Sequence, residues 1–215
     1  MDSVSKRLTH SSFCVAVFVG WFCCLFLSGL LPGFATLYQL GLAMAFLHMG
    51  ILLPYALFCW RSYSRRWAYL PLGRFSLRDL LLPALALFVL MLIHGHFARP
   101  ETWMNELFRK SVGVNVLTIL TLCLAAPIGE EIIFRGFVLN SSIGWGGGAK
   151  SVGIVTTSLL FAVVHMQYQS AITLVFLFVF SAILCVVRMH TRSLIAPIAL
   201  HMLNNGWVVL ALLSQ

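Results

Sequence analysis

The chain has 215 residues, of which 60% are hydrophobic and only 9% are charged, and its formal net charge is +8. A soluble domain carries about 25% charged residues, so this chain has too few polar side chains to cover its surface in water. The composition therefore excludes a soluble enzyme and indicates an integral membrane protein that is surrounded by lipid.

Continuous apolar runs of about 20 residues predict membrane-spanning helices, because ~20 helical residues cross ~30 Å of hydrocarbon. The runs do not alternate as the strands of a membrane barrel do. We predict an all-α, polytopic transmembrane bundle with about seven spans, at residues 12–31, 35–60, 79–97, 114–137, 150–168, 171–188 and 194–213. We divide it into three N-terminal spans (1–113) and a C-terminal core of four spans (114–215).

The basic residues predict the orientation of the chain. Ten lie on the side of the N-terminus, namely Lys6, Arg7, Arg61, Arg65, Arg66, Arg74, Arg78, Lys150, Arg188 and Arg192. Three lie on the other side, namely Arg99, Arg109 and Lys110. Since Lys and Arg are enriched in cytoplasmic loops, we expect a cytoplasmic N-terminus and an external C-terminus. The small size and short loops predict a bacterial cytoplasmic membrane.

Neither nucleic acid nor nucleotide is expected as a partner. The basic residues lie in short loops, where they act as topology signals, and do not form a soluble basic face. The segment 144–151 superficially resembles a phosphate-binding loop, but Ala149 stands where that pattern requires glycine before Lys150. We interpret it as a flexible cytoplasmic turn.

Two adjacent glutamates, Glu130 and Glu131, lie within the apolar fourth span. An ionised side chain at bilayer depth costs about 2.5–3.5 kcal/mol on insertion scales, and such residues face a protein interior or a water-filled cavity. Arg135 stands four residues after Glu131, so we expect these two to form a supporting ion pair on one helix face. Glu130 points about 100° away, toward a different neighbour.

Two other spans carry polar residues at the same spacing. Phe161 and His165 are four residues apart in the fifth span, and His201 and Asn205 are four apart in the seventh. Residues four apart share a helix face, so we expect three helices to direct Glu130 and these polar side chains at one buried point. Phe161 is expected to shape the cavity wall.

Prolines adjust the backbone near both groups. Pro127 lies just before the glutamates, and Pro197 lies one turn before His201. A proline cannot donate to the carbonyl four residues earlier, so it frees a backbone oxygen. Membrane helices tolerate such a group where protein or water satisfies it, which again predicts a cavity.

This set of residues favours hydrolysis. Glu130 would act as a general base on a water molecule. His165 would hold that water or stabilise developing charge. His201 and Asn205 would donate hydrogen bonds to an oxyanion, a contribution that is often the largest in such reactions.

Three short motifs carry a family resemblance: Glu130-Glu131-x-x-x-Arg135, Phe161-x-x-x-His165 and His201-x-x-x-Asn205. Together they resemble the signature of the CPBP family, which contains the CAAX prenyl endopeptidases and the bacteriocin-processing, Abi-type membrane proteases. The resemblance covers about residues 114–213 and leaves the first three spans aside. It implies endoproteolysis inside the membrane, with Glu130 as the activating residue.

The resemblance leaves metal dependence open, because the family has been described both as metalloproteases and as glutamate-type proteases. Two histidines and a carboxylate are a plausible zinc set, so His165, His201 and Glu130 are the candidate ligands of one divalent ion such as zinc. The sequence has no His-Glu-x-x-His motif, and Asn205 suits an oxyanion better than zinc. We therefore favour a metal-free glutamate mechanism that requires no cofactor.

Two alternatives come from other classes of protein. Acidic and histidine residues within spans also build proton relays, so a proton-coupled transporter is one alternative, although the sequence shows no inverted repeat. A non-catalytic membrane scaffold is the other. We interpret four other histidines, His48, His94, His96 and His190, as helix–helix hydrogen-bond partners.

The expected substrate is a membrane-anchored protein or peptide. A prenylated C-terminus, a peptide leader and a membrane-anchored sorting tail remain open. A bacterial chain favours the last two.

Overall fold

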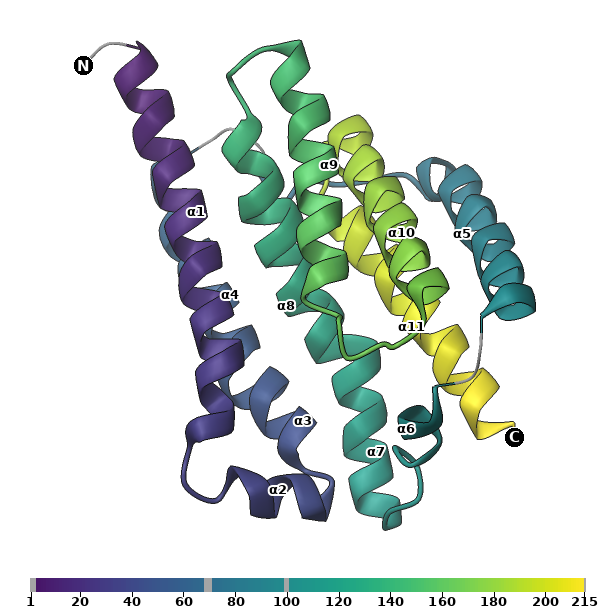
Figure 1. Ribbon diagram of the computed structural model, residues 1–215. Coiled ribbons are helices and arrows are strands. Elements are labelled where there is room, and N and C mark those ends of the chain that lie inside the picture. The colour runs from purple at the N-terminus through teal and green to yellow at the C-terminus, as the bar shows by residue number, and fades with distance from the viewer. Residues whose placement is uncertain (1–2, 68–70, 99–100, 215) are drawn as a thin grey trace.

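The computed structural model describes residues 3–67, 71–98 and 101–214. Arg99, one of the three basic residues expected on the outer side, lies outside them. The described residues form a bundle of helices whose N- and C-termini lie at opposite ends (Figure 1). No strand occurs in these ranges.

The α-helices are, in chain order, α1 (Ser3–Leu27), α2 (Phe34–Leu40), α3 (Ala43–Ala45), α4 (Leu53–Arg66), α5 (Leu77–Phe97), α6 (Thr102–Asn105), α7 (Val112–Leu120), α8 (Ala126–Ile133), α9 (Gly147–Val163), α10 (Ala171–Thr191) and α11 (Ile195–Leu213). The 3₁₀ turns are η1 (Ser28–Leu30) and η5 (Leu139–Ser142). The π-helical segments are η2 (Phe46–Leu52), η3 (Thr121–Ala125) and η4 (Phe134–Val138).

Within the described residues, 6 continuous helical stretches are long and apolar enough to cross a membrane: Val4–Leu30, Ala43–Arg66, Leu77–Phe97, Val112–Ser142, Ala171–Thr191 and Ile195–Leu213. A shorter apolar helix, α9, has 17 residues, which is the lower limit for a span. The all-α, polytopic fold with about seven spans is thus confirmed.

Two span boundaries differ from those expected. The span predicted at 35–60 is divided, because α2 ends at Gly41, whose φ of 78° lies in the left-handed region that favours glycine. The membrane helix then runs from Ala43 to Arg66. Helix α9, which corresponds to the span predicted at 150–168, ends at Val163. His165 therefore lies in the turn that follows this helix and not on the helix itself.

The N-terminal spans pack directly against the site-bearing helices. Phe134 is fully buried and makes an edge contact with Trp21 of α1, with ring centroids 5.7 Å apart. Gly136 lies against Trp60 of α4, and an added Cβ would stand 2.9 Å from that indole ring. The small residue therefore permits α4 to approach the helix that carries the glutamates.

Hydrogen bonds also connect distant segments at both ends of the bundle. At the N-terminal end, the backbone N–H of Leu194 donates to the Leu72 carbonyl at 2.7 Å. At the other end, one carboxylate oxygen of Glu101 accepts from the backbone N–H groups of Gln169 and Ser170, each at 3.0 Å. The loop before α7 is thereby attached to the start of α10.

Candidate active site

Glu130 lies on α8 and faces two histidines. Its side chain is buried, and the residue is 7% exposed. Its Oε2 lies 4.0 Å from Nε2 of His165 and 3.9 Å from Nε2 of His201. These distances exceed a direct hydrogen bond but suit a water molecule placed between the groups. The structure therefore brings together the carboxylate and both imidazoles that the sequence singles out.

The other ring nitrogen of each histidine has an acceptor of its own. Nδ1 of His165 lies 2.7 Å from the backbone oxygen of Phe161. Nδ1 of His201 lies 2.8 Å from Oε1 of Glu131. An oxygen that only accepts favours the tautomer with the proton on Nδ1. In the neutral rings, the lone pair on Nε2 then faces Glu130.

Glu131 is the centre of a buried polar cluster. Its Oε1 accepts from Nη1 of Arg135 at 2.9 Å as well as from His201. The second guanidinium nitrogen, Nη2, donates to the backbone oxygen and the hydroxyl of Ser181 on α10, at 3.0 and 2.9 Å. The expected Glu131–Arg135 pair is present with both side chains fully buried, and it also fixes the orientation of His201.

Phe161 forms part of the wall, as expected. Its ring lies 4.7 Å from the ring of His165 and 5.9 Å from that of His201, centroid to centroid. The guanidinium carbon of Arg135 lies 5.0 Å from the same ring, within the range of a cation–π contact. Phe161 therefore packs between the two histidines and the cation.

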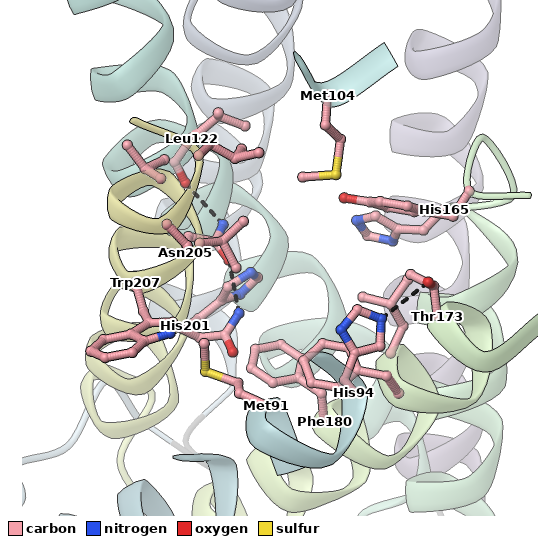
Figure 2. A pocket seen from close by; sticks show the side chains of 18 of the residues that line it. Met91, His94, Met104, Leu122, His165, Thr173, Phe180, His201, Asn205 and Trp207 are labelled. Carbon is pink, nitrogen blue, oxygen red and sulfur yellow. Dashed lines mark hydrogen bonds between the residues drawn. The ribbon is translucent and has the colours of Figure 1, made fainter. Parts of the chain in front are cut away.

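Asn205 satisfies a backbone oxygen that the helix leaves free. Its Nδ2 donates to the carbonyl of Leu122 in η3 at 2.9 Å, as Figure 2 shows. The N–H of Ala126 donates to Thr121, and residue 127 is a proline without an N–H. The Leu122 carbonyl thus loses both helical donors, and Asn205 replaces them with one of its two amide protons.

A cavity of about 430 Å³ joins these groups. Glu130, His165, His201 and Asn205 all line it. Figure 2 shows the imidazole of His165 on one side, with Met104 above it, and Asn205 and His201 on the other side. The lining is mostly apolar, so the few polar groups stand out among apolar side chains.

Sequence reasoning missed several polar residues of this cavity, namely His48, Gln167, Tyr168, Thr173 and Asn204. His48, in η2, lines it and is within electrostatic reach of Glu130 and His165. Tyr168, in the turn before α10, lines it too, and burial with the charges of Glu130 and Glu101 raises the pKa of Tyr168 to about 12. In the sequence, the only indication of these residues is that each is a polar side chain within or beside an apolar run.

His94 fulfils the expected helix–helix role. Its Nε2 lies 3.1 Å from the hydroxyl of Thr173, which connects α5 to α10 (Figure 2). It also lines the cavity.

All three π-helical segments adjoin the site. Segment η2 carries His48, η3 carries the Leu122 carbonyl, and η4 carries Arg135. A π-helical turn inserts one residue into the helix and is frequent at functional sites. Here each segment adds a polar side chain or a free carbonyl to the site.

The candidate metal ligands have suitable donor atoms but not the spacing of a bound ion. Zinc–ligand bonds of about 2.0–2.2 Å place two ligand atoms of one tetrahedral ion roughly 3.4 Å apart. The distances from Glu130 to the two histidines are 3.9 and 4.0 Å. Over the described ranges, no group of three or more His, Cys, Asp or Glu side chains is arranged to hold a metal ion. The side chains as placed do not fit a metal centre.

Comparisons with known proteins identify the family of this chain. Residues 112–207 match the family of type II CAAX prenyl endopeptidase Rce1-like proteins. A protein of Escherichia coli, described as an uncharacterized 24.3 kDa protein, is 36% identical over an alignment of 177 residues, and the match covers 77% of this chain and 80% of the relative. No solved structure matches the chain.

The family match identifies this helical membrane protein as a hydrolase of the protease class. The matched residues contain all three motifs of the site. The chain belongs to the Rce1-like family of type II CAAX prenyl endopeptidases, which confirms the family resemblance in its sequence.

Proposed function

We propose that this protein cleaves a peptide bond of a membrane-anchored protein or peptide with a water molecule that Glu130 activates. The observation that carries the proposal is the position of Glu130 Oε2, 3.9 and 4.0 Å from the Nε2 atoms of His201 and His165. A water molecule in contact with the carboxylate can reach either ring.

The reaction follows from these positions. Glu130 takes one proton from the water, and the oxygen forms a bond to the substrate carbonyl carbon. The protonated Glu130 then gives the proton to the nitrogen of the leaving amine as the C–N bond breaks. The products are a carboxylic acid, which keeps the second proton of the water, and an amine, and Glu130 returns to its ionised form.

The two histidines orient the water. In the favoured tautomer each Nε2 is an acceptor, so one imidazole can hold the second proton of the water while Glu130 removes the first. Either ring donates at Nε2 only after it gains a proton. Asn205 has a second amide proton that needs no such change, and it is the better candidate for the oxyanion.

The proposed substrate is anchored in the membrane. The family name points to a C-terminal tail of the Cys-aliphatic-aliphatic-X type, whereas the Escherichia coli relative favours a bacterial leader or sorting tail. The excess of basic residues at one end supports a bacterial cytoplasmic membrane with the N-terminus in the cytoplasm.

The test uses the full chain in lipid nanodiscs and a panel of internally quenched peptides. The panel contains a farnesylated Cys-aliphatic-aliphatic-X peptide, its unprenylated counterpart and an apolar leader peptide. We expect cleavage of at least one peptide, lost in Glu130→Ala. Uptake of protons or solute into sealed vesicles without cleavage would instead support the transporter. The absence of both cleavage and uptake would support the scaffold.

The same assay decides metal dependence. A zinc chelator should leave the rate unchanged if Glu130 and the histidines act without an ion. Inhibition by the chelator, with recovery on added zinc and metal found in the purified protein, would contradict the metal-free mechanism.

A further inference from the structure

Asn204, next to the motif residue Asn205, is a buried amide with an unused acceptor. It is 7% exposed, and its Nδ2 donates to Oδ1 of Asn205 at 3.2 Å. Its own Oδ1 has no hydrogen-bond partner among the described residues and is enclosed by its surroundings. Such a group is costly to leave unpaired in an apolar environment.

The orientation of this amide is fixed by the backbone. The Leu122 carbonyl can only accept, so the group of Asn205 that meets it must be Nδ2. Oδ1 of Asn205 is then the acceptor that faces Asn204, and Asn204 must present Nδ2 to it. The unpaired group of Asn204 is therefore its acceptor oxygen and not its amide nitrogen.

Asn204 stands where two hollows meet. One is the cavity that contains Glu130, and the other is a hollow of about 520 Å³ between α5 and α11. Both are lined by Phe88, Met91, Asn204 and Trp207.

The second hollow opens toward the outer surface of the bundle. Its rim includes Leu85, Leu203 and Leu210, which are 58%, 63% and 65% exposed. In a membrane these side chains face lipid. Asn204 is the one carboxamide among the described residues that line this hollow.

We propose that Asn204 is a substrate-binding residue whose Oδ1 accepts a hydrogen bond from a backbone N–H of the substrate peptide, which lies in the hollow between α5 and α11 and extends to Glu130. This inference rests on the proposed peptidase function. A peptide carries the donor that the oxygen lacks, whereas an acyl or prenyl chain carries none. The site therefore selects a peptide segment at this point, and the lining side chains must part to admit it.

The experiment scans the substrate backbone. In the peptide of the panel that is cleaved best, each peptide N–H other than that of the cleaved bond is replaced in turn by an ester oxygen. The wild-type full chain should lose about tenfold in kcat/KM at one position near the cleaved bond, as loss of a hydrogen bond to a buried acceptor predicts. Asn204→Leu should lose about tenfold with the all-amide peptide and show no further loss with that ester.

Asn115 provides the matched control. Its Oδ1 also lacks a partner among the described residues, and its Nδ2 donates to the Phe108 carbonyl. It lines neither hollow, so Asn115→Leu should keep the full sensitivity to the ester. Thermal unfolding adds a second readout: Asn204→Leu removes an unpaired acceptor but also the donor to Oδ1 of Asn205, so its midpoint should fall by no more than the loss of one hydrogen bond predicts.

Two results would overturn the inference. The wild type could cleave every ester peptide as fast as the amide, a result that does not depend on the folding of any variant. Alternatively, Asn204→Leu could retain the tenfold sensitivity. If cleavage still disappears in Glu130→Ala, the peptidase function stands and only the role of Asn204 fails. Absence of cleavage across the panel contradicts both.

Discussion

Nδ1 of His201 donates a hydrogen bond to Oε1 of Glu131 at 2.8 Å, while the opposite nitrogen of the same ring faces Glu130 at 3.9 Å. The two adjacent glutamates therefore hold different positions around one imidazole. Glu131 fixes the tautomer and orientation of the ring, and Glu130 faces the cavity. This arrangement explains how neighbouring carboxylates can serve separate purposes.

Removal of the Arg135 guanidinium should destabilise the protein strongly. Arg135→Ala leaves the carboxylate of Glu131 buried without its cation and removes two hydrogen bonds to Ser181. Loss of one partner of a buried ion pair costs about 3–5 kcal/mol. We expect a large drop in the thermal unfolding midpoint and in the yield of folded protein in detergent.

Arg109 gives the matched control for that variant. It pairs with Glu106 at the same 2.9 Å distance, but the two side chains are 69% and 65% exposed. Because exposed ion pairs contribute little, Arg109→Ala should unfold close to the wild-type midpoint. Equal midpoints for the two variants would contradict the structural role of Arg135.

Loss of the His165 imidazole should abolish turnover and leave the fold intact. The ring is partly exposed to the cavity, and its described polar contacts are the Phe161 carbonyl and the approach to Glu130. We expect His165→Ala to reduce the cleavage rate at least 100-fold, the effect of losing a positioned acid–base group. His96 is exposed on α5, so His96→Ala should retain the wild-type rate. A similar rate loss in both variants would exclude a specific role for His165.

Asn205 should contribute to stability as well as to catalysis. Asn205→Leu leaves the partly buried Leu122 carbonyl without a donor, which costs about 1 kcal/mol, the contribution of a typical hydrogen bond, and the unfolding midpoint should fall. Pro127→Ala restores an N–H within reach of that carbonyl, so the double variant should recover much of the lost stability. If the double variant recovers none of the lost stability, the hydrogen bond to the Leu122 carbonyl is not the means by which Asn205 stabilises the protein.

The overall fold and the central site were predictable because their signals are local. Apolar runs near 20 residues identify spans directly, and the spacing of four places Glu131 with Arg135 and His201 with Asn205. The pairing of Glu131 with Arg135 and the approach of Glu130 to both histidines are confirmed. The catalytic roles of these residues remain predictions.

Other features depend on packing between distant segments. The sequence did not indicate that Arg135 would bind Ser181 or that His201 would bind Glu131, since these contacts join separate helices. The break of the second span at Gly41 was missed because the surrounding apolar run gives no indication that this glycine adopts a left-handed conformation. His48 was interpreted as a helix–helix hydrogen-bond partner because nothing in its neighbourhood in the chain connects it to Glu130.

The most direct test of the central claim is the cleavage rate of Glu130→Gln measured beside its thermal unfolding midpoint. Glutamine keeps the size of the side chain but cannot take a proton from water. The proposed mechanism predicts a rate at the level of the uncatalysed reaction and an unfolding midpoint no lower than that of the wild type. A Glu130→Gln protein that cleaves the peptide at the wild-type rate would contradict water activation by this carboxylate.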